Sequence, residues 1–285
     1  MSDLNAATEF IHLHARLLDR HRFAHHFGGA DAQPIVRALR AYQNADGGFG
    51  HAIEPDLRGP VSQPGGVSTA LEVLVELDAG DEPMVDAAAG FLATITRADG
   101  GVPFVLPSAR EYPRAPWWQP ADESSVTQTA YNAAMLYALG SRHPWLEGAS
   151  AFLWQRIDAG EVLDGAYDAR FAIAFLDATP EEDRAERALD ALAPGLRDSG
   201  LVAVDPDAPG EVHTPLDFSP WPDSRSRRLF DEAVIERHLD ALAARQREDG
   251  GWTFNWPAWS RAAELEWRGL VTIRALQVLR AHGRI

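Results

Sequence analysis

The segment from residue 51 to residue 64 holds the densest group of side chains that could do chemistry. It reads His-Ala-Ile-Glu-Pro-Asp-Leu-Arg-Gly-Pro-Val-Ser-Gln-Pro, so that Glu54, Asp56 and Arg58 occupy alternate positions in a proline-rich stretch. Prolines lower the entropic cost of holding such side chains in place. Burial against apolar neighbours raises the pKa of a carboxyl group and keeps it protonated, as a general acid requires. Glu54 and Asp56 are therefore the candidate catalytic residues.

The same residues also fit a structural interpretation. Arg58 can neutralise one of the two carboxylates, and a nearby positive charge lowers the pKa of its partner. Only one of the pair should then be the acid, while the other holds Arg58 in place. The sequence alone leaves both interpretations open. A metal site at His51 and these carboxylates matches no dedicated ligand spacing, so we expect no metal.

Aromatic residues gather in other long connections that are rich in proline and glycine. Tryptophan can hold loops together, which is its commoner role, or line an apolar or sugar-binding cavity and steady a cation. Together with polar neighbours, these aromatic residues complete a candidate substrate-binding set: Arg58, Gln63, Trp117, Trp118, His213, Trp221 and Trp256.

The composition excludes several kinds of chemistry. All 26 basic residues among the 285 are arginine, and there is no cysteine. A Schiff-base lysine, a P-loop lysine, a thiolate nucleophile, a cysteine-ligated zinc and a disulfide are therefore impossible. The net charge of −16 argues against nucleic acid or an anionic membrane as partner. With no signal-peptide pattern and no apolar run of about 18 residues, we expect a soluble cytoplasmic protein that needs no cofactor. The oligomeric state stays open.

An internal repeat indicates which elements position the candidate residues. Gln43–Gly50 recurs as Gln246–Trp252, and Thr96–Val102 is a copy without the glutamine. Gln155–Gly160 and Asp198–Gly200 are decayed copies, and the mean spacing of the motif aspartates is roughly 51 residues, the length of two helices and their connections. Aspartate can bond the amides of a turn and glycine allows positive φ, so the motif itself is interpreted as structural.

Apolar residues at intervals of three and four predict an all-α chain. About ten helices are expected, at 4–27, 31–43, 67–79, 83–97, 124–140, 145–158, 167–178, 181–197, 230–247 and 261–282. Most of the long connections follow copies of the motif, and short ones separate them. Alternate connections of an antiparallel helix array lie at opposite ends, so the segments 51–64 and 112–120 should meet at one end, where function usually resides.

The two fuller motif copies, Gln43–Gly50 and Gln246–Trp252, resemble the QW repeats of the squalene-cyclase and protein prenyltransferase superfamily. The resemblance implies an α/α toroid, a single barrel of five to six helical hairpins that forms one domain over residues 1–285. It also implies a central apolar cavity and an isoprenoid-like small molecule as partner.

The chain departs from that superfamily in its catalytic motifs. It has neither the DxDD motif of class II terpene cyclases nor the DDxxD motif of class I synthases, and it lacks the cysteine of the prenyltransferase zinc site. Whether the chain is an enzyme is thus open. Three hypotheses follow: acid-catalysed chemistry on an apolar isoprenoid-type substrate, a binding or scaffold toroid without chemistry, and a carbohydrate-active α/α-barrel enzyme.

Overall fold

A computed structural model describes residues 2–285 and divides them into two compact units. The terminal unit combines residues 2–39 with 202–285, and the central unit spans residues 40–201. Twelve α-helices account for most of the described residues, and paired strands are limited to one two-stranded sheet and isolated bridges. The predicted all-α class is therefore confirmed. That the whole chain is a single domain stays a prediction.

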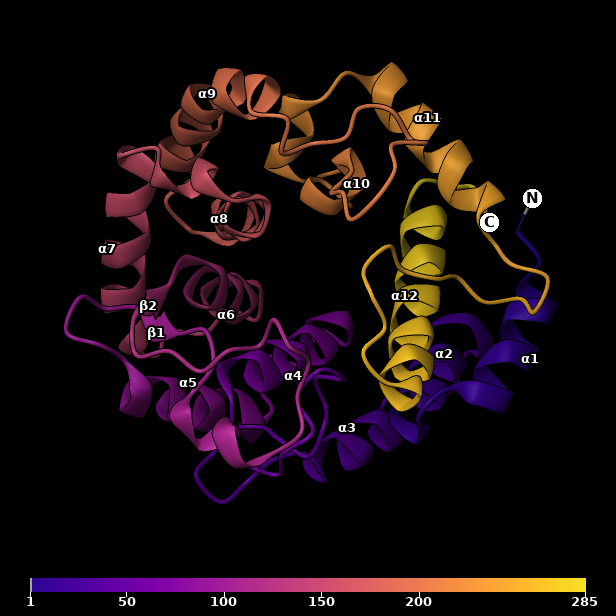
Figure 1. Ribbon diagram of the computed structural model, residues 1–285, viewed down its shortest axis with the longest axis horizontal. Coiled ribbons are helices and arrows are strands. Elements are labelled where there is room, and N and C mark those ends of the chain that lie inside the picture. Colours follow the sequence, from indigo (N-terminus) through magenta and orange to yellow (C-terminus); the bar gives the residue numbers. More distant parts are fainter. Residues whose placement is uncertain (1) are drawn as a thin grey trace. The chain divides into compact units, whose positions relative to one another are not determined.

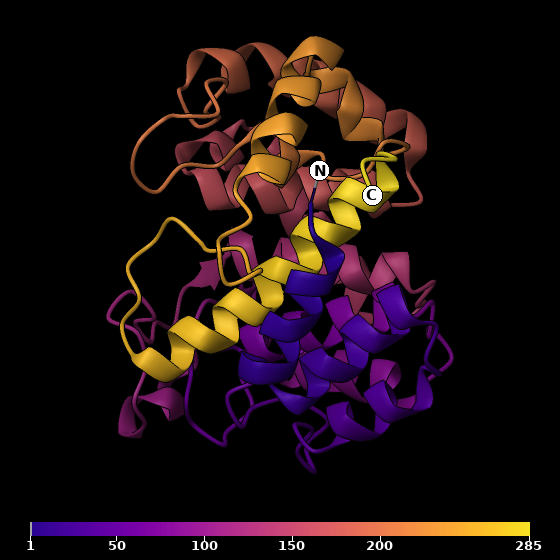
Figure 2. The ribbon, with the colours of Figure 1, turned by 90° about the vertical axis from the view of Figure 1, so that its right-hand side faces the viewer.

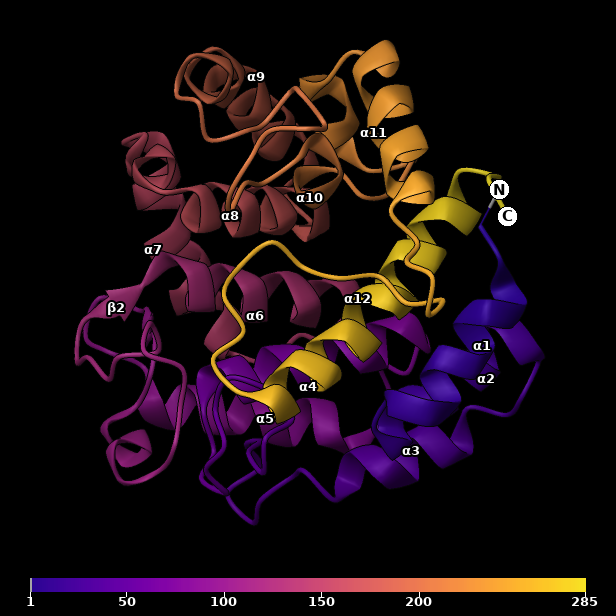
Figure 3. The same cartoon turned by 45° about the vertical axis from the view of Figure 1, so that its right-hand side comes forward.

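The central unit consists of two layers of helices (Figure 1). In one layer α6 packs against both α4 and α8, as Figure 3 shows. The other layer covers it, and short 3-10 turns and a two-stranded sheet fill the connections. The first layer comprises α4 (Pro64–Glu76), α6 (Val126–Ala138) and α8 (Ala166–Ala178), and the second α5 (Pro83–Ile95), α7 (Trp145–Asp158) and α9 (Glu182–Asp198). The minor elements are β1 (Val102–Pro103), η1 (Pro107–Glu111), β2 (Ser124–Ser125) and η2 (Glu161–Asp164).

The terminal unit is built around its last helix, α12 (Arg261–Ala281). This helix packs against α1 and α2, as Figure 2 shows, and against α11. Its core contains Phe10, Ile11, Trp252, Ile273 and Leu276. The remaining elements are α1 (Leu4–His14), α2 (Leu17–Gly28), α3 (Gln33–Arg40, which ends in the first residue of the central unit), α10 (Pro215–Phe218), η3 (Arg225–Leu229) and α11 (Glu232–Ala244).

The prediction of one continuous helix over 4–27 was wrong, because the chain forms two helices, α1 and α2, separated by Ala15 and Arg16. Both residues have extended backbone angles. The break lets Arg16 turn back onto Asp19, whose fully buried carboxylate also accepts from Arg22 at 2.8 Å. A buried carboxylate without such partners would be strongly unfavourable. Pairing of Asp19 therefore outweighs continuity of the helix.

The start of α4 also differs from the expectation of residue 67. Pro64, Gly65 and Gly66 form its first turn rather than a loop. Proline suits the first helical position, where its missing N–H is no loss. A Cβ at Gly66 would lie 2.4 Å from the carbonyl oxygen of Phe49. The glycines thus allow the first repeat motif to lie directly against the helix.

The motif aspartates tie the turns to the helices that follow. Asp46, Asp99 and Asp249 each accept the N–H of the glycine two residues on, at 3.0, 3.2 and 3.1 Å. Asp46 also accepts from Ser62 at 2.7 Å and Asp99 from Ser124 at 2.6 Å, just before α4 and α6. In the terminal unit Arg268 of α12 takes the place of the serine. These bonds support the structural interpretation of the repeat.

Candidate functional site

The segment 51–62 is a loop whose two ends are held together at the first repeat motif. The side-chain amide of Asn44 donates to the carbonyl of Pro60 at 2.8 Å and to Ser62 at 2.9 Å. The backbone N–H of Gln63 donates to the carbonyl of Phe49 at 3.0 Å. The motif therefore fixes where the candidate catalytic loop begins and ends.

A tight turn at the start of this loop directs the chain toward Glu54. His51 and Ala52 have φ of 58° and 62°, and the Ile53 N–H donates to the Gly50 carbonyl at 3.1 Å. Two consecutive positive φ values define a type I′ turn, which favours Asn and Gly. Alanine pays a steric cost in this conformation, so the fold around it must hold the turn in place. Ile53 and Glu54 follow immediately and are buried.

Glu54 is 6 % exposed and is positioned by its own loop and by α4. Its Oε1 accepts the backbone N–H of Asp56 at 3.2 Å. Its Oε2 lies 3.4 Å from the hydroxyl of Thr69, which is also 2.9 Å from the carbonyl of Gly65. A hydroxyl has a single hydrogen, and the shorter contact is the better hydrogen bond. The Thr69 hydroxyl therefore donates chiefly to Gly65 and has only a long contact with Glu54.

Asp56 is 3 % exposed and joins the loop to the segment 112–120. Its Oδ2 accepts the indole N–H of Trp117 at 3.2 Å, and its carbonyl accepts the N–H of Ala115 at 2.9 Å. The N–H of Arg58 donates to the carbonyl of Pro113 at 3.0 Å. The two segments meet, as the alternation of long and short connections predicts.

Gln63 and Trp118 have structural contacts in this region. The Gln63 side chain accepts the N–H of Leu106 at 2.8 Å and donates to Ser108 at 2.9 Å. The Trp118 ring stacks on Phe104 with centroids 4.8 Å apart and lies against Gly65, where a Cβ would come within 2.8 Å of it. These contacts hold the segment 104–118 on the amino-terminal end of α4.

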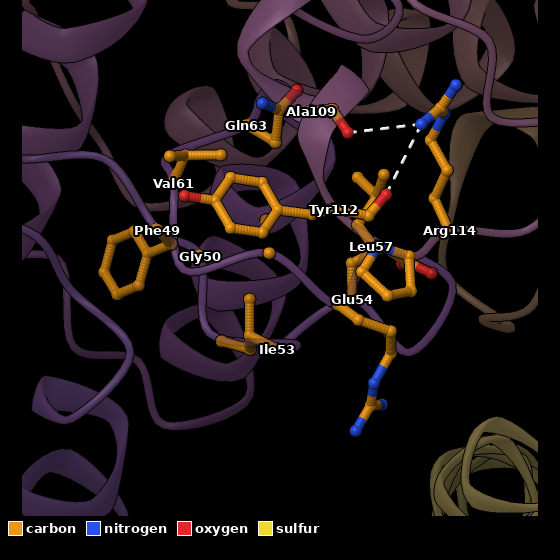
Figure 4. Close-up of a pocket in the computed structure, with 14 residues that line it drawn as sticks. Phe49, Gly50, Ile53, Glu54, Leu57, Val61, Gln63, Ala109, Tyr112 and Arg114 are labelled. Atoms are coloured by element: carbon orange, nitrogen blue, oxygen red, sulfur yellow. Dashed lines mark hydrogen bonds between the residues drawn. The ribbon is translucent and has the colours of Figure 1, made fainter.

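A small pocket opens between these segments, and it contains Glu54 and Arg58 (Figure 4). Its free volume of about 10 Å³ is close to what one water molecule needs. Asp56 does not line it. Its wall is mainly apolar and is formed by Phe49, Gly50, Ile53, Glu54, Leu57, Arg58, Gly59, Val61, Gln63, Gly66, Ala109, Tyr112, Pro113 and Arg114.

Sequence reasoning missed Tyr112 and Arg114, which are both in this wall. Arg114 donates from Nε to the carbonyl of Trp118 at 2.9 Å and from one terminal nitrogen to the carbonyl of Ala109 at 3.2 Å. The same nitrogen reaches the Tyr112 carbonyl at 3.4 Å, as the dashed lines in Figure 4 show. Arg114 therefore holds the backbone on both sides of Tyr112. The position of Tyr112 in a long proline-rich connection was the only available signal.

Three of the candidate binding residues belong to the terminal unit. His213 is buried and meets Phe218 edge to face at 6.2 Å. Trp256 stacks on Phe254 with centroids 4.5 Å apart, and Trp221 is 44 % exposed. The structure thus gathers six of the candidate residues in the central unit: Glu54, Asp56, Arg58, Gln63, Trp117 and Trp118. A shared site with His213, Trp221 and Trp256 stays a prediction.

The described residues contain neither a cluster of metal ligands nor a membrane-spanning helix. Within residues 2–285 there is no group of three or more histidine, aspartate or glutamate side chains arranged to hold a metal ion. Over the same span, none of the helices has the length and apolar character needed to cross a membrane.

Two solved structures are similar in fold to this chain. The structure matches that of the type II terpene cyclase MstE from Scytonema with a TM-score of 0.54, at 13% identity, over 99% of this chain and 88% of that one. The chain has a terpene-cyclase-like fold. A protein from Actinoplanes is also similar, with a TM-score of 0.59 and 18% identity over 98% of this chain and 89% of that one.

These similarities confirm the predicted fold class, the all-α toroid, and extend no further. No family model matches the chain, and no curated protein matches its sequence. Membership of the QW-repeat superfamily therefore stays a prediction. Identities of 13% and 18% carry no residue roles from one chain to the other. The function must be argued from the site itself.

Proposed function

We propose that the chain is a terpene-cyclase-like enzyme that protonates an apolar, isoprenoid-type substrate, with Glu54 as the proton donor. The observation that supports this most is the burial of Glu54 in a mainly apolar pocket, within a loop closed at its base. An acid that must protonate a hydrocarbon has to be kept away from bulk water. The likeness in fold to a type II terpene cyclase supports the substrate class.

The proposed step is transfer of the Glu54 carboxyl proton to one carbon of a carbon–carbon double bond. The O–H bond breaks, the π electrons of the alkene form the new C–H bond, and the neighbouring carbon becomes a cation. Glu54 is left as a carboxylate. The reaction ends when the cation loses a proton, or when it captures water and the adduct loses one. A proton from solvent then restores Glu54.

The two carboxyl groups have different roles in this proposal. Glu54 lines the pocket, and its Oε2 lies 3.4 Å from the neutral hydroxyl of Thr69, whose oxygen could accept a hydrogen bond once the carboxyl is protonated. Asp56 points to Trp117 instead and holds the segment 112–120. Asp56 is therefore a positioning residue. Its loss should disturb the wall of the pocket rather than remove the proton.

Incubation with farnesol, geranylgeraniol and squalene in D₂O tests the proposal, with products analysed by mass spectrometry. Protonation by an acid that exchanges with solvent places deuterium on a carbon of the product. Glu54→Gln should reduce turnover by about a hundredfold or more, the usual contribution of a general acid. Asp56→Asn should retain more activity and lose stability. Glu72→Gln is the matched control, because Glu72 is on α4, accepts a hydrogen bond from Tyr131 of α6 and does not line the pocket.

The mainly apolar lining of the pocket is equally compatible with a second function, binding of an apolar ligand without chemistry. Saturable binding of these polyenes without conversion would favour it. Equal turnover by Glu54→Gln and the parent protein, or products without carbon-bound deuterium, would contradict the assignment of Glu54. The pH profile gives a further check. Turnover should fall as pH rises, because the donor must be protonated.

A further inference from the structure

The ring of Tyr112 occupies the middle of the pocket. Tyr112 follows η1 in an extended conformation, and its ring lies flat against Gly59, where a Cβ would be 2.8 Å from ring atoms Cγ and Cδ2. Figure 4 shows the ring between the Val61 side of the pocket and the Leu57 side. Only about 10 Å³ remains free beside it. A hydrocarbon group can enter this space only if the ring leaves it.

The Tyr112 side chain is held less firmly than its backbone. Its N–H donates to Ala109 at 3.1 Å and its carbonyl accepts from Arg114. Across residues 2–285, its hydroxyl forms no hydrogen bond with another protein group. Packing alone therefore retains the ring. Rotation about its side-chain bonds would break no protein hydrogen bond and would leave the Arg114 contacts intact.

Tyr131, in the same unit, is a tyrosine whose side chain is held by a hydrogen bond as well as by packing. Its hydroxyl donates to Glu72 at 2.6 Å, and its ring stacks on Phe171 with centroids 4.2 Å apart. A hydrogen bond to a charged group is about twice as strong as one between neutral groups. Moving Tyr131 would cost this bond as well as the stacking. Tyr112 has no such bond to lose.

We infer that Tyr112 is a gate and the specificity-determining residue of this pocket: its ring stands where one branched, uncharged hydrocarbon unit of the ligand binds. The inference rests on the proposed function for its choice of an isoprenoid-type ligand. A phenol ring and one isoprene unit are of similar size. Ile53, Leu57 and Val61 provide the apolar wall against which the unit would pack. The ligand takes the place of the ring rather than filling an existing cavity.

A gate of this kind lowers the apparent affinity in a predictable way. Ligand binds only the fraction of molecules in which the ring has moved, so the apparent dissociation constant is the intrinsic constant divided by that fraction. Truncating the ring makes every molecule open. Tyr112→Ala should therefore bind farnesol at least about tenfold more tightly than the parent protein. Tyr112→Phe keeps the ring and should stay within about threefold of it.

Titration calorimetry with farnesol tests these expectations, with straight-chain 1-dodecanol as the unbranched probe. Tyr167→Ala removes a tyrosine ring that is 43 % exposed on α8 and does not line the pocket, so it is the matched control. Tyr112→Ala should increase the affinity for farnesol by a larger factor than the affinity for dodecanol. Equal affinity of Tyr112→Ala, Tyr167→Ala and the parent protein would overturn the gate. If Tyr112→Ala does not fold in thermal melts, Tyr112→Leu replaces it.

Fluorine NMR of the fluorotyrosine-labelled protein follows the gate without truncating the ring. The chain has five tyrosines, so the Tyr112 signal can be assigned from its absence in Tyr112→Phe. Farnesol should shift the Tyr112 signal more than that of Tyr131. An unmoved Tyr112 signal at saturating farnesol would overturn the inference.

The binding measurements are repeated in a Glu54→Gln background to separate this inference from the proposed chemistry. Tighter binding by Tyr112→Ala without turnover by any variant supports the gate and contradicts the acid. If turnover depends on Glu54 but affinity does not depend on Tyr112, Glu54 is supported as the proton donor and the role of Tyr112 as a gate is overturned.

Discussion

Three repeat turns of the central unit, called joints below, differ in what surrounds one glycine. The joints at Asp46 and Asp99 keep a complete Asp-Gly-Gly and are called intact, whereas the joint at Asp158 has decayed. Gly47, Gly100 and Gly160 all have positive φ, at 86°, 94° and 75°. A Cβ at Gly47 would lie 2.3 Å from the carbonyl oxygen of Ala87, and one at Gly100 would lie 2.5 Å from that of Gly148. At Gly160 a Cβ would meet nothing within 4 Å. Glycine is thus required for space at the intact joints and only for conformation at the decayed one.

The second glycine of the intact joints extends the comparison. A Cβ at Gly48 would lie 2.8 Å from the ring of Phe91, and one at Gly101 would lie 3.0 Å from that of Phe152. Each phenylalanine is four residues after the residue whose carbonyl meets the first glycine, so both contacts come from one face of α5 or α7. The decayed joint has alanine before its only glycine. A complete Asp-Gly-Gly therefore marks a turn against which the second helix after it, α5 or α7, packs closely.

The largest expected effect comes from adding a methyl group at these joints. Gly47→Ala forces a Cβ into a helix backbone and also strains φ, so it should cost about 3 kcal/mol or more, as overpacking in a core can. Gly160→Ala should cost only the backbone strain of a positive φ, about 1 kcal/mol. Urea unfolding of both variants measures the difference. Equal losses would mean that the close approach of α5 does not constrain the first joint.

The sequence predicted these joints because the motif and its spacing are local and repeated. It also predicted that 51–64 and 112–120 meet, because connection lengths alternate along an antiparallel array. It did not indicate Tyr112 or the role of Arg114. Arg114 acts through backbone carbonyls that are brought together by the 3-10 turn η1, and carbonyls leave no pattern in a sequence.

Glu54 and Asp56 illustrate the same limit. Their pattern indicated a buried acid with a positioning partner, but not which residue had which role. The two differ in whether the side chain lines the pocket or meets Trp117. That difference depends on the turn at His51 and Ala52. Both residues have positive φ, a conformation that is usually expected only where the sequence has glycine or asparagine.

A smaller effect should distinguish the last repeat joint, in the terminal unit, by its pH dependence. Arg268 donates two hydrogen bonds of 2.8 Å to Asp249, and these hold the pKa of that carboxyl below its ordinary value. A carboxyl with a lowered pKa stabilises the fold above its unfolded-state pKa, and the contribution is lost as pH falls through its folded-state pKa.

Asp249→Asn should therefore lower the melting temperature at neutral pH but not in strong acid, where the parent carboxyl is itself protonated. Because the Asp249 side chain is 43% exposed, solvent limits the effect to about 0.5–1 kcal/mol. Melting curves from neutral to acid pH test this. A difference that stays constant with pH would show that Arg268 contributes through packing on Phe10, whose ring lies 4.5 Å away.

The smallest expected effect has the opposite sign and comes from the loop rather than the joints. Ala52 has the left-handed conformation that Gly47 and Gly160 have, with φ of 62°. An alanine in this conformation is destabilising by about 1–2 kcal/mol, whereas a glycine loses about 0.5–1 kcal/mol of additional chain entropy on folding. Ala52→Gly should therefore raise the free energy of unfolding by about 0.5 kcal/mol. Gly140→Ala, at φ of 69° with nothing within 4 Å of its Cβ, is the matched reverse change and should lower the free energy of unfolding.

If Ala52→Gly destabilises the protein, contacts of the alanine methyl hold the turn. If it stabilises the protein but slows turnover, the strained turn serves to keep Glu54 in place.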